Sequence, residues 1–510
     1  METPEPEPGP ARAANPGSEA FSRITRNILD LGAAQVLTMA ASSVVAVILP
    51  RFLGDVNLGK LAFAGAYTTY FTLIVSLGTG IYLTKEVARS PSQMAEYTVN
   101  AALTRLPLAL VAATLGVLTI NLLGYDEMTK KVVYVMFIGM TLGTTYGILV
   151  GSAQGLQEMR PVAVSQVIIR VVDSSVVTTL LLTGHGLMEV ALTNSLSSGV
   201  GLLIVGYALA RREGFRFSIN LGMWRPLLLG GLPFFASRVS RLIYARVDML
   251  MLSGFAGPAV IGWYAAAYRI IAIPALVPSI VMMAIFPPLS AAAASGDQRS
   301  FNSITRRGLQ VVLVGTVPMA AGLMLLSDKL IEVIRYPSEF EHSVPLIIIL
   351  SLGSPLVAVD MVVGTALNAL DKQGQWAMVG VGAALLNPAM NMVLIPVTDS
   401  AYGNGAIGAA AATVTTEAFI MVVGLWLLPR GVLDRGSLSI ALRCLAAAAV
   451  MAGAVWMVRD LPIAVPVAVG VVVYGCCCLL FRAVFPSDLR RFWVYFQERQ
   501  GARTSVATGG

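Results

Sequence analysis

The chain has 510 residues, of which 56% are hydrophobic and only 12% are charged, with a formal net charge of +7 and a mean hydropathy of +0.75. Soluble domains carry about 25% charged residues, so the composition excludes a soluble protein. Apolar runs of about 20 residues recur from residue 27 to residue 481, and each can span about 30 Å of hydrocarbon. Because backbone groups in lipid must be satisfied within their own segment, these runs predict an all-α polytopic membrane protein.

The N-terminal segment, residues 1–26, precedes the first apolar run. Its first 20 residues are rich in proline and lack the basic start and short apolar core of a signal peptide. We therefore expect a disordered cytoplasmic tail.

The apolar runs predict fourteen transmembrane helices. Of the 35 lysines and arginines, 22 lie in or beside predicted inner segments, 7 in or beside outer loops and 6 within spans. This asymmetry favours an even number of spans with both termini in the cytoplasm. The spans are 27–49, 57–83, 101–123, 132–153, 161–183, 187–210, 226–255, 259–290, 308–326, 344–369, 376–397, 406–428, 438–458 and 461–481.

A basic cytoplasmic loop at 211–225 divides the chain near its middle. It predicts an N-lobe at 27–210 and a C-lobe at 226–428, each with six helices, followed by two further helices within 429–483. A weak internal repeat supports the division, because "LGDVNLGKLAFA" after the first span resembles "AGPAVIGWYAAA" after the seventh. Gly54 and Gly59 then correspond to Gly257 and Gly262, at an offset of 203 residues. Six helices in each half make the repeats parallel, an arrangement found in transporters.

The C-terminal segment, residues 484–510, contains an amphipathic pattern. Leu489, Phe492, Trp493 and Phe496 recur at helical spacing and are flanked by arginines. This pattern predicts an interfacial helix on anionic lipid within a cytoplasmic tail.

Four charged residues lie within eleven positions of the seventh span: Arg238, Arg241, Arg246 and Asp248. Each would cost about 2.5–3.5 kcal/mol at the centre of a lipid-facing helix, so water, a partner or a substrate must offset the cost. At 100° per residue all four fall on one half of the helix.

Other spans add Arg170 and Asp173, at the i, i+3 spacing of a local pair, and Arg269. Two interpretations stay open: these residues pair across helices or reach the interfaces, or they line a water-filled cationic cavity. A guanidinium group matches phosphate oxygens in a bidentate fork, so such a cavity would suit a phosphate or pyrophosphate head group. In that case Asp173 and Asp248 would orient the arginines or exchange with the substrate.

Two further acids lie in spans, Asp360 and Glu417. Each could bind H⁺ or Na⁺ and couple transport to an ion gradient, or be a hydrogen-bonded buried acid. Apart from that coupling we expect no cofactor. The four cysteines and two histidines show no metal-ligand spacing, and no catalytic motif is present, so we expect neither a metal site nor an enzyme.

Three stretches together resemble a known family: "NILDLGAAQVLTMAASSVVAVILPRFLG", "RVDMLMLSGFAGPAVIGWYAAAYRII" and "NPAMNMVLIPVTDSAYGNGAIG". They are similar to the polysaccharide-transporter and O-antigen flippase branch of the multidrug/oligosaccharidyl-lipid/polysaccharide exporter superfamily. The resemblance implies a V-shaped bundle of two six-helix lobes. It also implies that the cavity arginines, here Arg238, Arg241, Arg246 and Arg269, bind a head group, and that the two last helices form a groove for a lipid tail, as in lipid II flippases.

These observations lead us to expect a flippase that moves a polyprenyl-pyrophosphate-linked oligosaccharide across the cytoplasmic membrane by alternating access, with Arg170 assisting the other arginines. The expected partners are the lipid bilayer, the lipid-linked glycan and proteins of polysaccharide assembly, and no nucleic acid. The alternatives are an ion-coupled drug or cation exporter of the same superfamily and a lipid II flippase. A membrane glycosyltransferase or polymerase is disfavoured, because such enzymes usually need a large outer loop and the longest one here has 17 residues.

Overall fold

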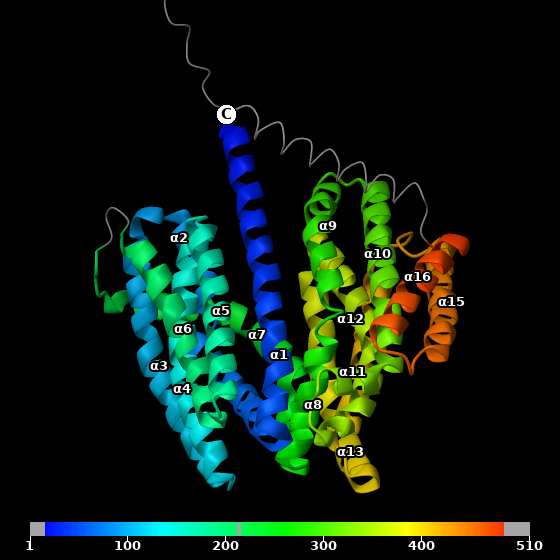
Figure 1. The fold of residues 1–510 in the computed structure, drawn as a ribbon. Coiled ribbons are helices and arrows are strands. Elements are labelled where there is room, and N and C mark those ends of the chain that lie inside the picture. Colours follow the sequence, from blue (N-terminus) through cyan, green and yellow to red (C-terminus); the bar gives the residue numbers. More distant parts are fainter. Residues whose placement is uncertain (1–15, 212–215, 484–510) are drawn as a thin grey trace, which may run out of the picture. The chain divides into compact units, whose positions relative to one another are not determined.

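The computed structural model describes residues 16–211 and 216–483, and every regular element within them is a helix (Figure 1). The interfacial helix expected within 484–510 lies outside the described residues, as do residues 1–15 of the expected tail and residues 212–215 of the basic loop. Residues 16–26, expected in the disordered tail, are helical, because α1 begins at Pro16.

The chain forms two compact units, and the first comprises residues 1–45 and 71–235. In Figure 1 its helices α3 to α6 form one group, in which α3 packs on α4 and both α4 and α5 pack on α6. Leu83, Ile148, Val162 and Val205 are fully buried in its core. The helices are the two ends of α1 (Pro16–Ser76), α2 (Thr79–Arg89), η1 (Pro91–Gln93), α3 (Met94–Leu122), α4 (Glu127–Gly155), α5 (Met159–Leu182), α6 (Leu187–Ala210), η2 (Leu221–Met223) and the start of α7 (Trp224–Phe255).

The second unit comprises residues 46–70 and 236–510. One core joins α9, α10 and α12 around Leu289, Val312 and Val362, and a second joins α10 to α15 and α16. Its helices are the middle of α1, the rest of α7, α8 (Pro258–Ile271), α9 (Leu276–Ala294), α10 (Gln298–Leu325), α11 (Ser327–Val333), η3 (Ser338–Ser343), α12 (Val344–Ala369), α13 (Gln373–Tyr402), α14 (Ala406–Leu427), α15 (Arg435–Met457) and α16 (Ala464–Leu480). Because residues 46–70 group with the second unit, this division differs from the expected lobes, which stay a prediction.

The number of membrane spans follows from the lengths of these helices. Eleven described helices are long and apolar enough to cross a membrane, α16 is apolar but shorter, and α7 with its five charged residues is not among the eleven. Helices cover all fourteen apolar segments expected from the sequence, and α1 contains the first segment and most of the second, with a break at Gly54. The chain is a multi-pass, all-α membrane protein, as predicted.

Two expected spans are interrupted. The second breaks at Leu77 and Gly78, which have φ values of 39° and 72° and separate α1 from α2. The eighth breaks between α8 and α9, where Pro274 lies, whereas Pro287 and Pro288 are accommodated within α9. A proline removes one helical hydrogen bond, which explains the break at Pro274.

Acidic side chains start several helices. Asp126 accepts hydrogen bonds from the N–H groups of Met128 and Thr129 at the start of α4. Asp297 and Asp434 cap α10 and α15 in the same way. These carboxylates satisfy backbone donors that a helix leaves unpaired and complement the positive end of its dipole.

Candidate functional site

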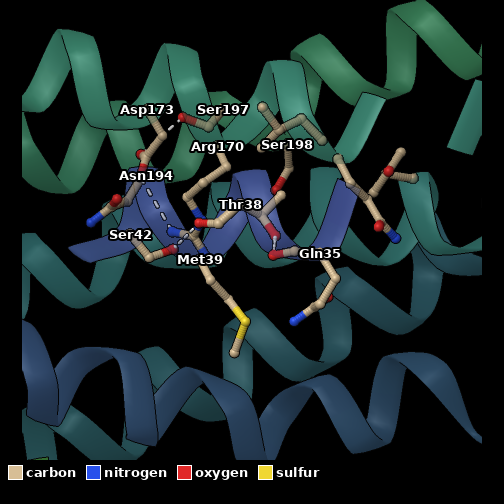
Figure 2. A pocket seen from close by; sticks show the side chains of 12 residues that line it. Gln35, Thr38, Met39, Ser42, Arg170, Asp173, Asn194, Ser197 and Ser198 are labelled. Carbon is tan, nitrogen blue, oxygen red and sulfur yellow. Dashed lines mark hydrogen bonds and ion pairs between the residues drawn. The ribbon is translucent and has the colours of Figure 1, made fainter. Parts of the chain in front are cut away.

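A polar cavity of about 510 Å³ lies within the first unit, between α1, α4, α5 and α6 (Figure 2). Most of its lining side chains carry amide or hydroxyl groups, although the surrounding helices span the membrane. The lining residues are Gln35, Thr38, Met39, Ser42, Tyr146, Gln166, Ile169, Arg170, Asp173, Asn194, Ser197 and Ser198.

The two charged residues of the cavity pair with each other. Arg170 Nη1 lies 3.6 Å from Asp173 Oδ2, at the i, i+3 spacing on α5 that predicted a local pair. The Arg170 side chain is 46% exposed, whereas that of Asp173 is 7% exposed and also accepts a hydrogen bond from Ser197 Oγ at 3.1 Å. The ion pair is confirmed, and the role of Arg170 in binding substrate stays a prediction.

The charged residues of α7 have contrasting environments. Arg246 is exposed and has no ion-pair partner among the described side chains, whereas Asp248 is 4% exposed. Asp248 Oδ2 accepts hydrogen bonds from the Tyr264 hydroxyl and from Thr413 Oγ1, the latter at 3.3 Å. Hydroxyl groups therefore contact the Asp248 carboxylate, and its expected pairing with arginines stays a prediction.

Arg238 and Arg241 lie on the same helix, but their side chains are outside the described part of the structure. Arg269 lies near the C-terminal end of α8 and is half-buried. Burial raises the pKa of the Tyr336 phenol, and the opposing positive charge of Arg269 limits the rise, so that the pKa lies at about 12. The Tyr336 hydroxyl donates to the carbonyl of Ala46 at 2.6 Å.

The two acids considered for ion coupling, Asp360 on α12 and Glu417 on α14, are 7% and 8% exposed. Within the described residues neither carboxyl group makes a hydrogen bond, and both Asp360 oxygens are completely buried. No group of three His, Cys, Asp or Glu side chains in residues 16–211 and 216–483 is placed to hold a metal ion.

A second, larger cavity of about 1010 Å³ lies in the second unit and is mainly apolar. Leucine, valine, alanine and methionine side chains from α10, α12, α14 and α15 form most of its wall. Polar groups gather in one part of the lining, where Arg306 Nη1 lies 2.7 Å from Asp434 Oδ2 and Gln310 lies nearby on α10.

Glycine residues allow two helices of the second unit to cross in close contact. A Cβ atom added at Gly59 on α1 would lie 1.8 Å from the Pro258 carbonyl oxygen, and one added at Gly262 on α8 would lie 2.0 Å from that of Asp55. These are the glycine positions paired by the sequence repeat. Beside the crossing, Trp263 Nε1 donates to Asp55 Oδ2 at 2.9 Å.

Several residues of the polar cavity were not expected from the sequence. Gln35, Gln166 and Asn194 are uncharged, and single amides occur in many membrane helices. The spacing of these residues in the sequence could have indicated the cavity. Its polar residues recur at intervals of three, four or seven positions on α1, α5 and α6, so each helix presents them on one face.

Arg105 is buried in α3 and is one of the six cationic residues within the predicted spans. Its Nη2 donates to Thr79 Oγ1 at 2.6 Å and its Nη1 to the carbonyl of Val75. These hydrogen bonds from Arg105 stabilise the non-helical turn between α1 and α2.

Curated relatives were found in Haloferax volcanii. The chain is 27% identical over 177 residues to the "Probable low-salt glycan biosynthesis flippase Agl15", a match covering 35% of this chain and 36% of that protein. It is 23% identical over 338 residues to the "Probable flippase AglR", covering 63% and 67% respectively. The chain thus spans about a third of the length of the first relative and about two thirds of the second.

Solved structures share the fold. The lipid II flippase MurJ in an inward closed conformation matches with a TM-score of 0.73 and 15% identity, over 90% of this chain and 99% of that one. A multidrug resistance MATE family transporter in an inward-facing conformation matches with a TM-score of 0.62 and 14% identity, over 76% and 93%. These similarities show that the chain shares the fold of these proteins.

Two family profiles match overlapping parts of the chain. The profile described as "Lipid II flippase MurJ" matches residues 232–464, somewhat less than half of the chain. The profile described as "Polysaccharide biosynthesis protein" matches residues 24–292, more than half of it. The chain therefore belongs to the polysaccharide biosynthesis protein family, in agreement with its resemblance to the multidrug/oligosaccharidyl-lipid/polysaccharide exporter superfamily.

Proposed function

We propose that the chain is a flippase that moves a polyprenyl-pyrophosphate-linked oligosaccharide across the cytoplasmic membrane by alternating access. Such a substrate joins a hydroxyl-rich glycan, an anionic pyrophosphate and a long apolar tail. The two relatives described as flippases support this activity. The inner excess of lysine and arginine favours a cytoplasmic location for both termini.

The observation that carries the proposal is the presence of two cavities of opposite character. The polar cavity of the first unit offers amides and hydroxyls, and the larger cavity of the second unit offers an apolar wall. Ligand cavities of proteins commonly have volumes of about 300–1,000 Å³, so both are large enough to hold part of a substrate. An amphipathic substrate needs both kinds of surface.

In this proposal the pyrophosphate is bound by arginines. Arg246 is exposed and lacks an ion-pair partner among the described side chains, so its guanidinium is available to an anion. Arg238, Arg241 and Arg269, which belong to the same unit as Arg246, would contribute to this anion site, whereas Arg170 of the first unit is paired with Asp173. The apolar cavity lined in part by α15 would receive the polyprenyl tail, the role implied for the last two helices.

The buried acids favour a coupled process. A carboxyl group in a membrane helix without a hydrogen-bond partner is costly unless it binds a proton or cation, and Asp360 meets this description. We propose that Asp360 or Glu417 couples transport to H⁺ or Na⁺. The same feature fits an ion-coupled drug exporter, so the identity of the transported substrate distinguishes the two functions.

The test is transport in proteoliposomes of a fluorescent undecaprenyl-pyrophosphate oligosaccharide, with and without H⁺ and Na⁺ gradients. Arg246→Ala should lower the rate about 10- to 100-fold, because hydrogen bonds to charged groups contribute about 1.5–3 kcal/mol. Arg299→Ala, at an exposed position near the start of α10, is the matched control and should transport at the normal rate. Normal transport by correctly inserted Arg246→Ala would remove the arginine assignment.

Two further outcomes separate the alternatives. Efflux of a cationic dye without transport of any lipid-linked glycan would identify an exporter. Transport restricted to the peptide-bearing precursor lipid II would identify a lipid II flippase.

A further inference from the structure

Three amide side chains of the polar cavity have no hydrogen-bond partner among the residues that the structure describes. Gln35 on α1, Gln166 on α5 and Asn194 on α6 all line the cavity, and the side chain of each makes no hydrogen bond within the described structure. Gln35 and Asn194 are labelled in Figure 2. Each amide has two N–H donors and a carbonyl with two lone pairs. The cavity thus presents three unused amides from three different helices.

Unused amides in membrane-spanning helices need an explanation. An amide without a hydrogen-bond partner is costly in an apolar environment, so polar groups in such helices usually pair with each other or face a water-filled or ligand-filled space. Asn387 and Asn391 of α13 show the usual solution, because Asn391 Nδ2 donates to Asn387 Oδ1 at 2.8 Å. The amides of the polar cavity instead remain available to a ligand.

The charges of the cavity indicate a ligand segment without net charge. Arg170 and Asp173 compensate each other, and the Asp173 carboxylate is also occupied by Ser197. Among the lining residues whose side chains the structure describes, no other is charged. This described lining therefore offers no unpaired acid that would attract an organic cation.

The hydroxyl groups complement the amides. Thr38 and Ser42 donate their protons to carbonyls of their own helix, α1, at 2.8 and 2.7 Å. Their oxygens can then only accept further hydrogen bonds, whereas the amide nitrogens can donate them. A sugar hydroxyl both donates and accepts, so a glycan can use both kinds of group.

We propose that this cavity is the sugar-recognition subsite of the transporter, with Gln35, Gln166 and Asn194 as specificity-determining residues. The inference rests on the proposed function and assigns the sugar-bearing part of the substrate to the first unit. The subsite selects substrates by hydrogen bonds to sugar hydroxyl and acetamido groups. A site built to make hydrogen bonds discriminates strongly against a ligand that lacks them, because its polar groups then stay unpaired.

The test measures binding to the full-length protein in lipid nanodiscs. The probes are farnesyl pyrophosphate and farnesyl pyrophosphates carrying glucose, galactose, N-acetylglucosamine or glucuronic acid. The wild type should bind at least one sugar-bearing probe more tightly than the sugar-free one. Asn194→Leu should reduce this preference about tenfold, as expected for the loss of one or two hydrogen bonds, and leave the affinity for farnesyl pyrophosphate unchanged.

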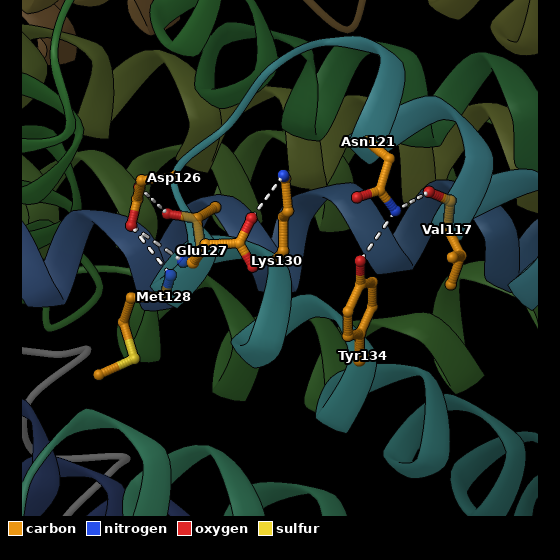
Figure 3. A network of polar contacts seen from close by, with 8 residues as sticks. Val117, Asn121, Asp126, Glu127, Met128, Lys130 and Tyr134 are labelled. Atoms are coloured by element: carbon orange, nitrogen blue, oxygen red, sulfur yellow. Dashed lines mark hydrogen bonds and ion pairs between the residues drawn. The ribbon is translucent and has the colours of Figure 1, made fainter.

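The chain offers a matched control at another amide of the first unit. Asn121, at the C-terminal end of α3, donates to the Tyr134 hydroxyl at 2.8 Å and to the Val117 carbonyl at 2.7 Å (Figure 3). It does not line the cavity, so Asn121→Leu should keep the wild-type preference. If Asn194→Leu does not fold, Gln166→Glu preserves the size of the side chain, replaces N–H donors by acceptors and should also reduce the preference.

The outcomes distinguish this inference from the proposed function. Binding of farnesyl pyrophosphate with no preference for any sugar would overturn the subsite and leave the flippase proposal in place. An unchanged preference in folded Asn194→Leu and Gln166→Glu would also overturn it. Failure of the wild type to bind every probe, the sugar-free one included, would remove the proposed function and this inference together.

Discussion

Acidic side chains cap the N-terminal ends of α4, α10 and α15. One of them, Asp434, contacts three parts of the structure. Its Oδ1 accepts from the Ser437 N–H at 2.8 Å at the start of α15, and its Oδ2 pairs with Arg306 of α10. Arg306 also donates to the carbonyl of Gly431 at 2.9 Å. Asp434 thereby joins α10, the segment before α15 and α15 itself beside the apolar cavity.

This arrangement predicts a pH dependence of stability. The hydrogen bonds from Ser437, and to a smaller extent Arg306, hold the pKa of Asp434 below its ordinary value of about 3.9. The ionised group therefore stabilises the folded state at all pH values above about 4, and this contribution is lost as the pH falls through the lower, folded-state pKa. Asp434→Asn should have a lower Tm than the wild type at pH 7, and the two curves of Tm against pH should converge below about pH 4.

The control for this comparison is Asp371→Asn, at an exposed position between α12 and α13. A difference between Asp434→Asn and the wild type that stays constant down to pH 3 would contradict the predicted linkage. Thermal melting in detergent between pH 3 and pH 8 provides the measurement.

The candidate residues show what a sequence can and cannot provide at this scale. The pairing of Arg170 with Asp173 was predictable, because both lie on one helix and the i, i+3 spacing brings them together. The contact of Asp248 with Thr413 was not predictable, because it depends on how α7 packs against α14. The same reason explains why the uncharged amides of the polar cavity were missed.

At the scale of helices, the crossing between the middle of α1 and α8 depends on the absence of side chains. Gly59 and Gly262 bring the two backbones together where each helix has just begun, after Gly54 and Gly257. Gly54 has a φ of 71°, which residues other than glycine rarely adopt, and it separates the two parts of α1. The carboxylate of Asp55 adds a hydrogen bond across the crossing.

Gly59→Ala should therefore be severely destabilising. Its new Cβ would meet backbone atoms of Pro258, which can move only if the helices separate. We expect a loss of about 3 kcal/mol or more, at the upper end of overpacking effects. The control is Gly65→Ala in the same helix, where no atom lies within 4 Å of the added Cβ, and thermal melting compares the two variants. Equal stability of Gly59→Ala and Gly65→Ala would show that the crossing is loose.

Hydrophobicity predicted the helices because lipid leaves the backbone no alternative to internal hydrogen bonding. It did not predict the break at Gly78, because the residues on both sides are apolar and the conformation depends on a tertiary contact. A Cβ at Gly78 would lie 2.2 Å from the carbonyl oxygen of Gly231 at the start of α7. The break near Pro274 was predictable as a kink, since proline acts through local sterics.

At the scale of the whole molecule, the chain contains two compact units with different cavities. The last two helices belong to the second unit, where Cys444, Tyr474 and Cys478 pack with Val317 of α10 in a shared core. α15 also forms part of the wall of the apolar cavity. The C-terminal helices thus add an apolar surface of the kind that a long lipid tail requires.

Filling the apolar cavity should discriminate between substrates by tail length. Ala441 lines the cavity, so Ala441→Trp should occupy part of it and reduce the transport of an undecaprenyl-linked glycan about tenfold. Transport of the same glycan on a farnesyl carrier should change much less. Ala446→Trp is the control, because Ala446 is exposed on the same helix and does not line the cavity. Equal effects of Ala441→Trp on both carriers would argue against a tail site here.

The glycine crossing has one more consequence, which concerns symmetry. Under the offset of 203 residues, the contact of Gly59 with Pro258 becomes the contact of Gly262 with Asp55, so the crossing maps onto itself as an isologous homodimer interface does. A shorter chain with one copy of this motif would present a self-complementary surface to a second copy of itself. One substitution in such a chain would alter the contact on both sides of the crossing. In this chain the two sides of the crossing differ. Trp263 donates to Asp55, whereas the equivalent positions are Lys60 and Pro258, a pair that offers no carboxylate acceptor.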